Sequence, residues 1–160
     1  MKSPVPFAIS HWRDAIGAAA AEIATYALGF DGATVGAPVD PVEVRGLVGP
    51  HISLLGGPSA LEIALVGTMD DCRRLAAAML QSDDPAALSE PDVADAVGEA
   101  LNMFAGSMKR RMASSGVDLE LGLPIFVVGH VRPTEQISVT PLQTHFGPIP
   151  MFVVVIGRAA

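Results

Sequence analysis

Residues 89–112 read SEPDVADAVGEALNMFAGSMKRRM, and their spacing predicts one long amphipathic helix. Ser89 with Asp92 three residues on forms a capping pattern, Pro91 suits a first turn, and the helix should end before Gly116. Apolar residues recur at helical spacing and define a stripe that faces the core. The stripe comprises Val93, Val97, Ala100, Leu101, Phe104, Met108 and Met112.

The opposite face of this helix is small and polar. It carries Asp95, Gly98, Glu99, Asn102 and Gly106. Each glycine costs a helix about 1 kcal/mol relative to alanine, so two glycines need a reason. Because glycine has no side chain, Gly98 and Gly106 could let a partner protein approach the helix beside Glu99 and Asn102. These two polar residues are neighbours at i and i+3. Alternatively, the polar side chains are simply solvated and the glycines admit a neighbouring helix of the same chain.

Two shorter helices are expected before this segment. The first should begin with Ser10 as its N-cap and run to about Leu28, where Gly29 stops it. The second should begin after Thr68, which has an aspartate three residues on, and end near Gln81. Three helices are therefore expected in all.

Extended patterns account for most of the remaining chain. Residues 32–41 are rich in Gly, Pro and Ala and carry no predicted strand. Runs rich in Val, Leu and Ile, separated by Gly and Pro, predict six strands. These are Val42–Val48, His51–Leu55, Ala60–Val66, Leu123–Val131, Gln136–Leu142 and Pro150–Ile156. The apolar stretch Met151–Ile156 would be an aggregation hazard as a bare edge, so we expect it inside the sheet or in a dimer.

The element order suggests two copies of one unit. Helix, three strands, helix, helix and three strands fit an α+β fold with an antiparallel sheet packed against helices. Asp14–Gly17 (DAIG) also reads like Asp95–Gly98 (DAVG) in the long helix. We expect a single domain over 1–160, with pseudo-repeats at about 8–81 and 89–157.

Composition limits the possible functions. The chain has 160 residues, half of them hydrophobic and 17% charged, which is a globular balance. Its net charge of −7 argues against nucleic-acid binding. No apolar run reaches the roughly 18 residues of a membrane span, and Ile16–Leu28 does not resemble a signal peptide. A cytoplasmic protein without a membrane anchor is expected.

Reactive side chains give few leads. Cys72 stands alone in a helical, apolar setting and is expected to be a buried, unreactive thiol. The four histidines show no metal-ligand spacing, so no metal site is expected. The basic cluster Lys109, Arg110 and Arg111 could steer an acidic partner, or it could only complement the helix dipole and solvate a surface.

The long helix resembles a known protein family. Residues 95–106 (DAVGEALNMFAG) are similar to the catalytic helix of the CheC, CheX and FliY chemotaxis phosphatases, with the Glu-x-x-Asn signature and its flanking glycines. Ala60–Leu80 resembles the segment before that helix, and Leu123–Gly129 the strand after it. The likeness is strongest to CheX, and it implies a pseudo-two-fold CheC-like fold.

The resemblance also implies an activity. Family members remove the phosphoryl group from an aspartyl-phosphate of CheY-like receiver domains. Asn102 would position the attacking water, and Glu99 would pair with a receiver lysine. The receiver would supply Mg²⁺, so no cofactor of the chain's own is expected. Further contacts with the partner are expected from Asp95, Gly98, Met103, Gly106 and Lys109.

The resemblance bears on assembly and leaves alternatives. CheX-type members are implied to be homodimers joined through their sheets. The first-helix positions equivalent to Glu99 and Asn102 are Ala18 and Ala21, which implies one site per subunit. A binding module that docks a receiver or flagellar-switch protein without catalysis would use the same helix. A purely structural role for the helix glycines is the third possibility.

Overall fold

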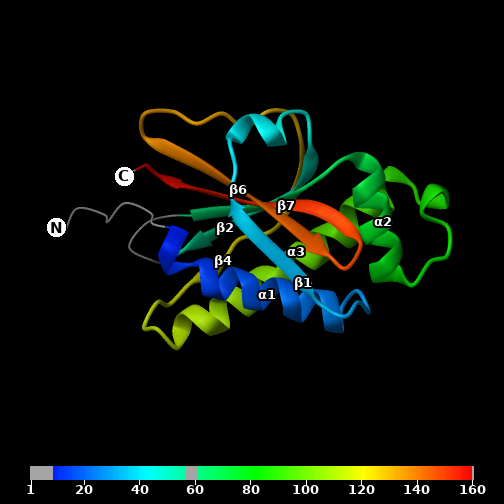
Figure 1. Cartoon of the computed structure of the whole chain (residues 1–160), viewed down its shortest axis with the longest axis horizontal. Coiled ribbons are helices and arrows are strands. Elements are labelled where there is room, and N and C mark those ends of the chain that lie inside the picture. The colour runs from blue at the N-terminus through cyan, green and yellow to red at the C-terminus, as the bar shows by residue number, and fades with distance from the viewer. Residues whose placement is uncertain (1–8, 57–60, 160) are drawn as a thin grey trace.

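The computed structural model describes residues 9–56 and 61–159. Three α-helices and a seven-stranded antiparallel sheet make up this part of the chain (Figure 1). The helices are α1 (Arg13–Tyr26), α2 (Met69–Leu80) and α3 (Glu90–Ala113). The strands are β1 (Ala33–Pro38), β2 (Val48–Leu55), β3 (Leu61–Val66), β4 (Glu120–Leu121), β5 (Ile125–Val128), β6 (Ile137–Phe146) and β7 (Ile149–Arg158). Short 3₁₀ turns are η1 (Ile9–His11), η2 (Pro41–Val44) and η3 (Pro85–Ala87).

The sheet confirms the expected α+β class and its pseudo-two-fold arrangement. Its strand order is β1-β6-β7-β3-β2, with β4 and β5 both pairing along the outer edge of β2. When β1, β2 and β3 are exchanged for β5, β6 and β7, the order β1-β6-β7-β3-β2-β5 reads the same from either end. The central pair is β3 with β7. The exact limits of the two repeats stay a prediction.

All three helices share one core with one face of the sheet. Their buried residues form a single cluster with sheet residues such as Ile63, Leu142 and Val153. A smaller cluster on the other face is built from Ala64, Val66, Val139 and Val154. Residues of η2 and β7 pack against that second cluster. In Figure 1, α1 and α3 lie side by side beneath the sheet, and contacts between them are extensive.

Capping at two helix starts is as expected, and capping at the third is not. The Thr68 hydroxyl accepts a hydrogen bond from the Asp71 amide (3.0 Å), and the Ser89 hydroxyl accepts one from the Asp92 amide (3.2 Å). Ser10 instead lies in η1, and the α1 N-cap position is Trp12, which makes no side-chain capping bond. The preceding 3₁₀ turn leads the chain into α1, so a serine cap was the wrong expectation.

The strand expectations before the long helix need two corrections. Val42–Val48 is not a strand, because Asp40 caps a 3₁₀ turn at Pro41–Val44 by accepting a hydrogen bond from the Val42 amide. Residues 32–41, expected to carry no strand, contain β1, which pairs with β6. Local composition did not reveal β1, since its hydrogen-bond partners lie more than a hundred residues further on. Ala60, the expected start of β3, lies outside the described residues.

Strand β2 runs through the Gly-Pro pair that was expected to break it. A Cβ atom on Gly49 would overlap the carbonyl oxygen of Leu65 in the neighbouring strand β3, so only glycine fits at this position. Pro50 pairs with Phe126 near this edge of the sheet.

The apolar strand near the C-terminus is interior. β7 pairs with β6 on one side and with β3 on the other, so Met151–Ile156 presents no bare edge. This confirms the expectation drawn from its hydrophobicity.

Candidate functional site

Helix α3 holds Glu99 and Asn102 on its outward side. The apolar stripe predicted for this helix is buried throughout, with Phe104 1% exposed, so the rotation of α3 about its axis is fixed by packing. Glu99 is exposed and Asn102 is half-buried. The two residues are neighbours one turn apart. A carboxylate and a carboxamide therefore project from the helix together.

The side chains of Glu99 and Asn102 take no part in the polar contacts that the structure describes. Over the residues that the structure describes, neither Glu99 nor Asn102 makes a side-chain hydrogen bond or ion pair. Burial of Glu99 and Asn102 against another segment of the chain, which would support a purely structural role for the helix glycines, is not observed among the described residues. Both polar groups remain available to an external partner.

Gly98 is buried, and its expected contact with a partner stays a prediction. A Cβ atom at this position would lie 3.9 Å from the ring of Pro124, in the segment that leads into β5. The bare helix surface at Gly98 is thus covered by this chain. Chain segments distant in sequence decide which glycine is covered, so helical periodicity did not reveal it.

A shallow pocket of about 160 Å³ lies beside Glu99. It is bounded by Pro50, Ala94, Asp95, Gly98, Glu99, Pro124 and Phe126. Two carboxylates stand at its rim, and prolines and an aromatic ring form its other side. Glu99 consequently borders a hollow, whereas Asn102 is not among the residues that line it.

The remaining expected contact residues lie along the same helix. Asp95 and Lys109 are exposed, Met103 is 37% exposed, and Gly106 is half-buried. A Cβ atom on Gly106 would lie 3.8 Å from a guanidinium nitrogen of Arg110. The helix surface at Gly106 is therefore partly covered by an arginine of α3 itself.

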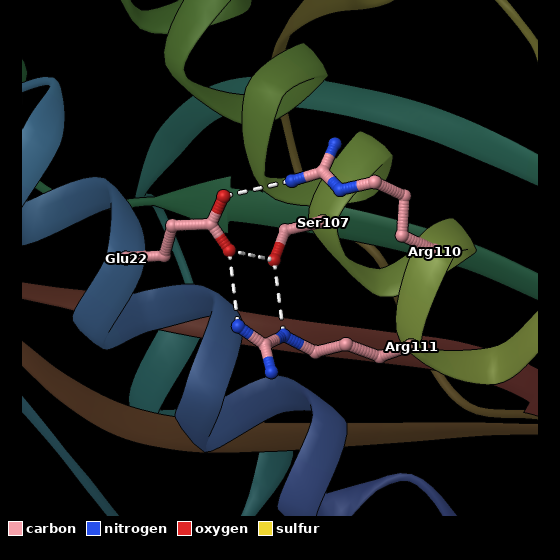
Figure 2. A network of polar contacts seen from close by, with 4 residues as sticks. All are labelled: Glu22, Ser107, Arg110 and Arg111. Atoms are coloured by element: carbon pink, nitrogen blue, oxygen red, sulfur yellow. Dashed lines mark hydrogen bonds and ion pairs between the residues drawn. The ribbon is translucent and has the colours of Figure 1, made fainter. Parts of the chain in front are cut away.

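A polar network joins α1 to α3 near this surface (Figure 2). The Ser107 hydroxyl donates to one carboxylate oxygen of Glu22 at 2.6 Å. Arg111 donates to that oxygen at 3.0 Å, and Arg110 donates to the other oxygen at 2.7 Å. Arg111 also donates to the Ser107 hydroxyl at 3.2 Å. One carboxylate thus holds two guanidinium groups and a hydroxyl.

The network lowers the pKa of Glu22. The hydrogen bond from Ser107 is the largest cause, and the two arginines act in the same direction against the opposing effect of burial. Glu22 was not singled out from the sequence, because 85 residues separate it from Ser107. The available signal was a polar residue, Ser107, at a position that proves fully buried on α3.

The other reactive groups lie apart from this surface. Cys72 is buried, and burial raises its pKa to about 12, which makes it the inert thiol that was expected. His51 is buried and contacts Glu62 at 2.5 Å. Within residues 9–56 and 61–159, no group of three potential ligands is arranged to hold a metal ion. None of the helices in this part of the chain has the length and hydrophobicity of a membrane span.

Comparison with known proteins agrees with this fold. The family described as Chemotaxis phosphatase CheX matches residues 52–145, a stretch that contains α2, α3 and β3 to β5 and parts of β2 and β6. No curated protein sequence matches the chain.

Several solved structures share the architecture. The chemotaxis protein CheX from Vibrio vulnificus superposes with a TM-score of 0.68 at 22% identity, covering 94% of this chain and 99% of that one. CheX from Desulfovibrio desulfuricans gives 0.70 at 19% identity, with 92% and 99% covered. CheX in a CheX-CheY-BeF3-Mg+2 complex from Borrelia burgdorferi gives 0.68 at 14% identity, with 93% and 98% covered. At these identities the likeness establishes a common fold.

Proposed function

The chain belongs to the CheX family of chemotaxis phosphatases, and we propose that it hydrolyses the aspartyl-phosphate of a CheY-like receiver domain. One observation carries the proposal. Glu99 and Asn102 stand side by side on the outer surface of α3, with no described partner in their own chain. A second protein can therefore meet both groups at once.

Asn102 is proposed to position the attacking water. Phosphoryl transfer depends mainly on alignment and charge stabilisation, and a carboxamide can donate to one oxygen while it accepts a hydrogen bond from water. Asn102 is half-buried on a rigid helix, which limits its side-chain motion. A fixed amide can hold water in line with the scissile bond.

Glu99 is proposed to anchor the receiver. Its exposed carboxylate can pair with a lysine of the partner, and the shallow pocket beside it gives that side chain room to enter. Asp95, Met103, Gly106 and Lys109 would contribute to the same contact. Gly98 would contribute as part of the wall of the pocket beside Glu99, where Pro124 also lies.

The receiver is proposed to supply the remaining chemistry. Its aspartyl-phosphate is the substrate, and its own acidic residues would hold the Mg²⁺ that stabilises phosphoryl charge. The Borrelia neighbour, a CheX-CheY complex with BeF3 and Mg+2, supports this division of roles. This chain would add the water-positioning amide and the anchoring carboxylate.

Assembly and compartment follow from the same proposal. We expect a cytoplasmic homodimer joined through the sheets. The β5 edge offers a place for the joint, since Leu123, Ile125 and Val128 are 87%, 63% and 74% exposed. Helix α1 carries Ala18 and Ala21 at the matching positions, so each subunit would have one site.

The test is phosphate release from a phosphorylated CheY-like receiver of the same organism, with Mg²⁺ present. The intact protein should accelerate release, and Asn102→Ala should lower kcat about 100-fold. Glu99→Ala should chiefly raise KM, about tenfold, because it removes an ion pair to the partner.

Glu90→Ala is the matched control for Glu99→Ala. Glu90 is an exposed carboxylate of the same helix, two and a half turns earlier and therefore on the other side. Glu90→Ala should leave kcat and KM within about twofold of the wild-type values. Full activity in both Asn102→Ala and Glu99→Ala would refute the roles proposed for these two residues, and no acceleration by the intact protein would refute the phosphatase proposal.

A non-catalytic binding module is the second candidate. It would use the same exposed pair to dock a receiver or flagellar-switch protein. Binding of the phosphorylated receiver with no increase in the rate of phosphate release would favour it.

A further inference from the structure

We propose that Arg110 is a second anchor for the partner, and that its guanidinium binds a carboxylate on the surface of the receiver domain. This inference rests on the proposed function and extends it along α3. It singles out one arginine of the basic cluster and assigns the chemistry that this arginine recognises.

The position of Arg110 on α3 places it on the face that carries the polar pair. Asn102, Gly106 and Arg110 follow at i, i+4 and i+8, and their Cα atoms span about 12 Å along the helix. Eleven residues, or about three turns, separate Arg110 from Glu99, which brings both to the same side. A partner lying along this face would meet the arginine after the amide.

The side chain of Arg110 is held toward Asn102. One terminal nitrogen donates to Glu22 at 2.7 Å (Figure 2). The other lies 3.8 Å from where a Cβ atom of Gly106 would stand. The Arg110 side chain therefore extends toward the N-terminus of α3 and lies over Gly106, one turn after Asn102. Glu22 fixes this conformation before any partner binds, which reduces the entropy lost on binding.

Charge remains on the cluster after Glu22 is counted. Arg110 and Arg111 share this single carboxylate, so one positive charge of the two guanidinium groups is left over, and the exposed Lys109 adds a second positive charge. Arg110 is 65% exposed, compared with 43% for Arg111, which also donates to the buried Ser107. Of the two guanidinium groups, Arg110 therefore presents its charge more fully to solvent.

The chemistry of this group favours an acidic ligand. A guanidinium has five donors in a planar fork that matches a carboxylate, and only part of that fork is used by Glu22. The chain as a whole carries a net charge of −7, so it repels an acidic surface except where such a cation stands. An aspartate or glutamate of the receiver is the group that fits.

Arg110 and Arg111 form a matched pair for the test, because each donates to Glu22 from the same turn of α3. The measurements are the Kd for a CheY-like receiver loaded with beryllofluoride and Mg²⁺, and KM and kcat for its phosphorylated form. Arg110→Gln should raise Kd and KM about fivefold and change kcat less than about twofold. Arg111→Gln should change Kd less than about twofold. Arg110→Lys should recover part of the loss, and added salt should shrink the difference between wild type and Arg110→Gln.

A purely structural tie between α1 and α3 predicts the reverse order. Arg111 makes the additional bond to Ser107, so Arg111→Gln would then be at least as harmful as Arg110→Gln in both stability and binding. That result, or an unchanged Kd in Arg110→Gln, would overturn the inference. Wild-type acceleration of phosphate release is measured in the same experiment. Its absence would refute the phosphatase proposal, and the binding comparison would still decide the role of Arg110.

Discussion

Helices α1 and α3 occupy matching places in the two halves of the fold, and the buried residues of α1 all have buried counterparts on α3. Aligning Asp14 with Asp95 pairs six buried residues in each helix. The pairs are Ala15 with Ala96, Ile16 with Val97, Ala19 with Ala100, Ala20 with Leu101, Ile23 with Phe104 and Ala24 with Ala105. The scaffold therefore uses one helix pattern twice.

The outward sides of the two helices differ. Where α3 has Glu99 and Asn102, α1 has Ala18 and Ala21. Packing constrains the buried stripe of each helix in the same way, and it places no such demand on the outer positions. The two helices therefore share a buried pattern, and the residues outside the core distinguish one from the other.

Their surroundings differ as well. A Cβ atom on Gly98 would meet Pro124 at 3.9 Å, whereas one on the matching Gly17 would meet nothing within 4 Å. Arg110 would correspond to Gly29, which lies beyond the end of α1 at Tyr26. The polar pair, the wall beside it and the cation after it are all confined to α3.

The largest effects are expected when one core side chain of each helix is truncated, which tests whether α1 and α3 are packed equally tightly. Phe104→Ala should cost about 3–5 kcal/mol and Ile23→Ala about 2–5 kcal/mol, because each leaves a cavity in the shared core. Urea denaturation of the two variants provides the measurement. A loss below about 1 kcal/mol in either would show that its helix is not packed as tightly as its partner.

Moving the polar pair from α3 to the matching positions of α1 tests whether the pair alone is sufficient for activity. Ala18→Glu with Ala21→Asn, introduced into the Asn102→Ala protein, should change stability by no more than about 0.5 kcal/mol, because both positions are half-buried at the surface. Phosphate release should stay at the Asn102→Ala level, since α1 lacks the Pro124 wall and a counterpart of Arg110. Recovery of the wild-type rate would mean that the pair alone suffices.

The smallest expected effect concerns the network that joins the two helices. The pKa of Glu22 is depressed below its ordinary value of 4.5, so its ionised form contributes stability at neutral pH. That contribution is lost as the pH falls through the folded-state pKa. In Glu22→Gln, the free energy of unfolding should therefore fall by about 0.5 kcal/mol less on acidification than it does in the wild-type protein.

Urea midpoints measured at neutral pH and at about pH 3 would reveal the effect. The wild-type protein should lose more stability between the two conditions than Glu22→Gln does. Identical losses in both proteins would show that Glu22 has no special role in coupling α1 to α3 through its charge.

Local patterns account for the features that the sequence analysis predicted correctly. The caps at Thr68 and Ser89, the buried stripe of α3 and the interior placement of Met151–Ile156 all follow from residues close in sequence. The adjacency of Glu99 and Asn102 also depends only on helix geometry. That their roles are catalysis and anchoring stays a prediction.

Where an expectation failed, a longer-range or competing local interaction was responsible. Val42–Val48 has an extended composition, yet Asp40 and Pro41 favour a 3₁₀ turn at its start. Strand β1 lies in a stretch poor in strand formers, and its pairing with β6 supplies the order that composition does not. Ser10 has a capping side chain, but the 3₁₀ turn moves the start of α1 beyond it.

By itself, the sequence determined the helices, most of the strands and the polar pair on α3, since periodicity and capping act over a few neighbouring residues. Only the tertiary structure decided that Pro124 covers Gly98 and that Glu22 holds Arg110 over Gly106. The physical reason is that such contacts join residues tens of positions apart. Their geometry exists only after the two halves of the sheet bring α1, α3 and β5 together.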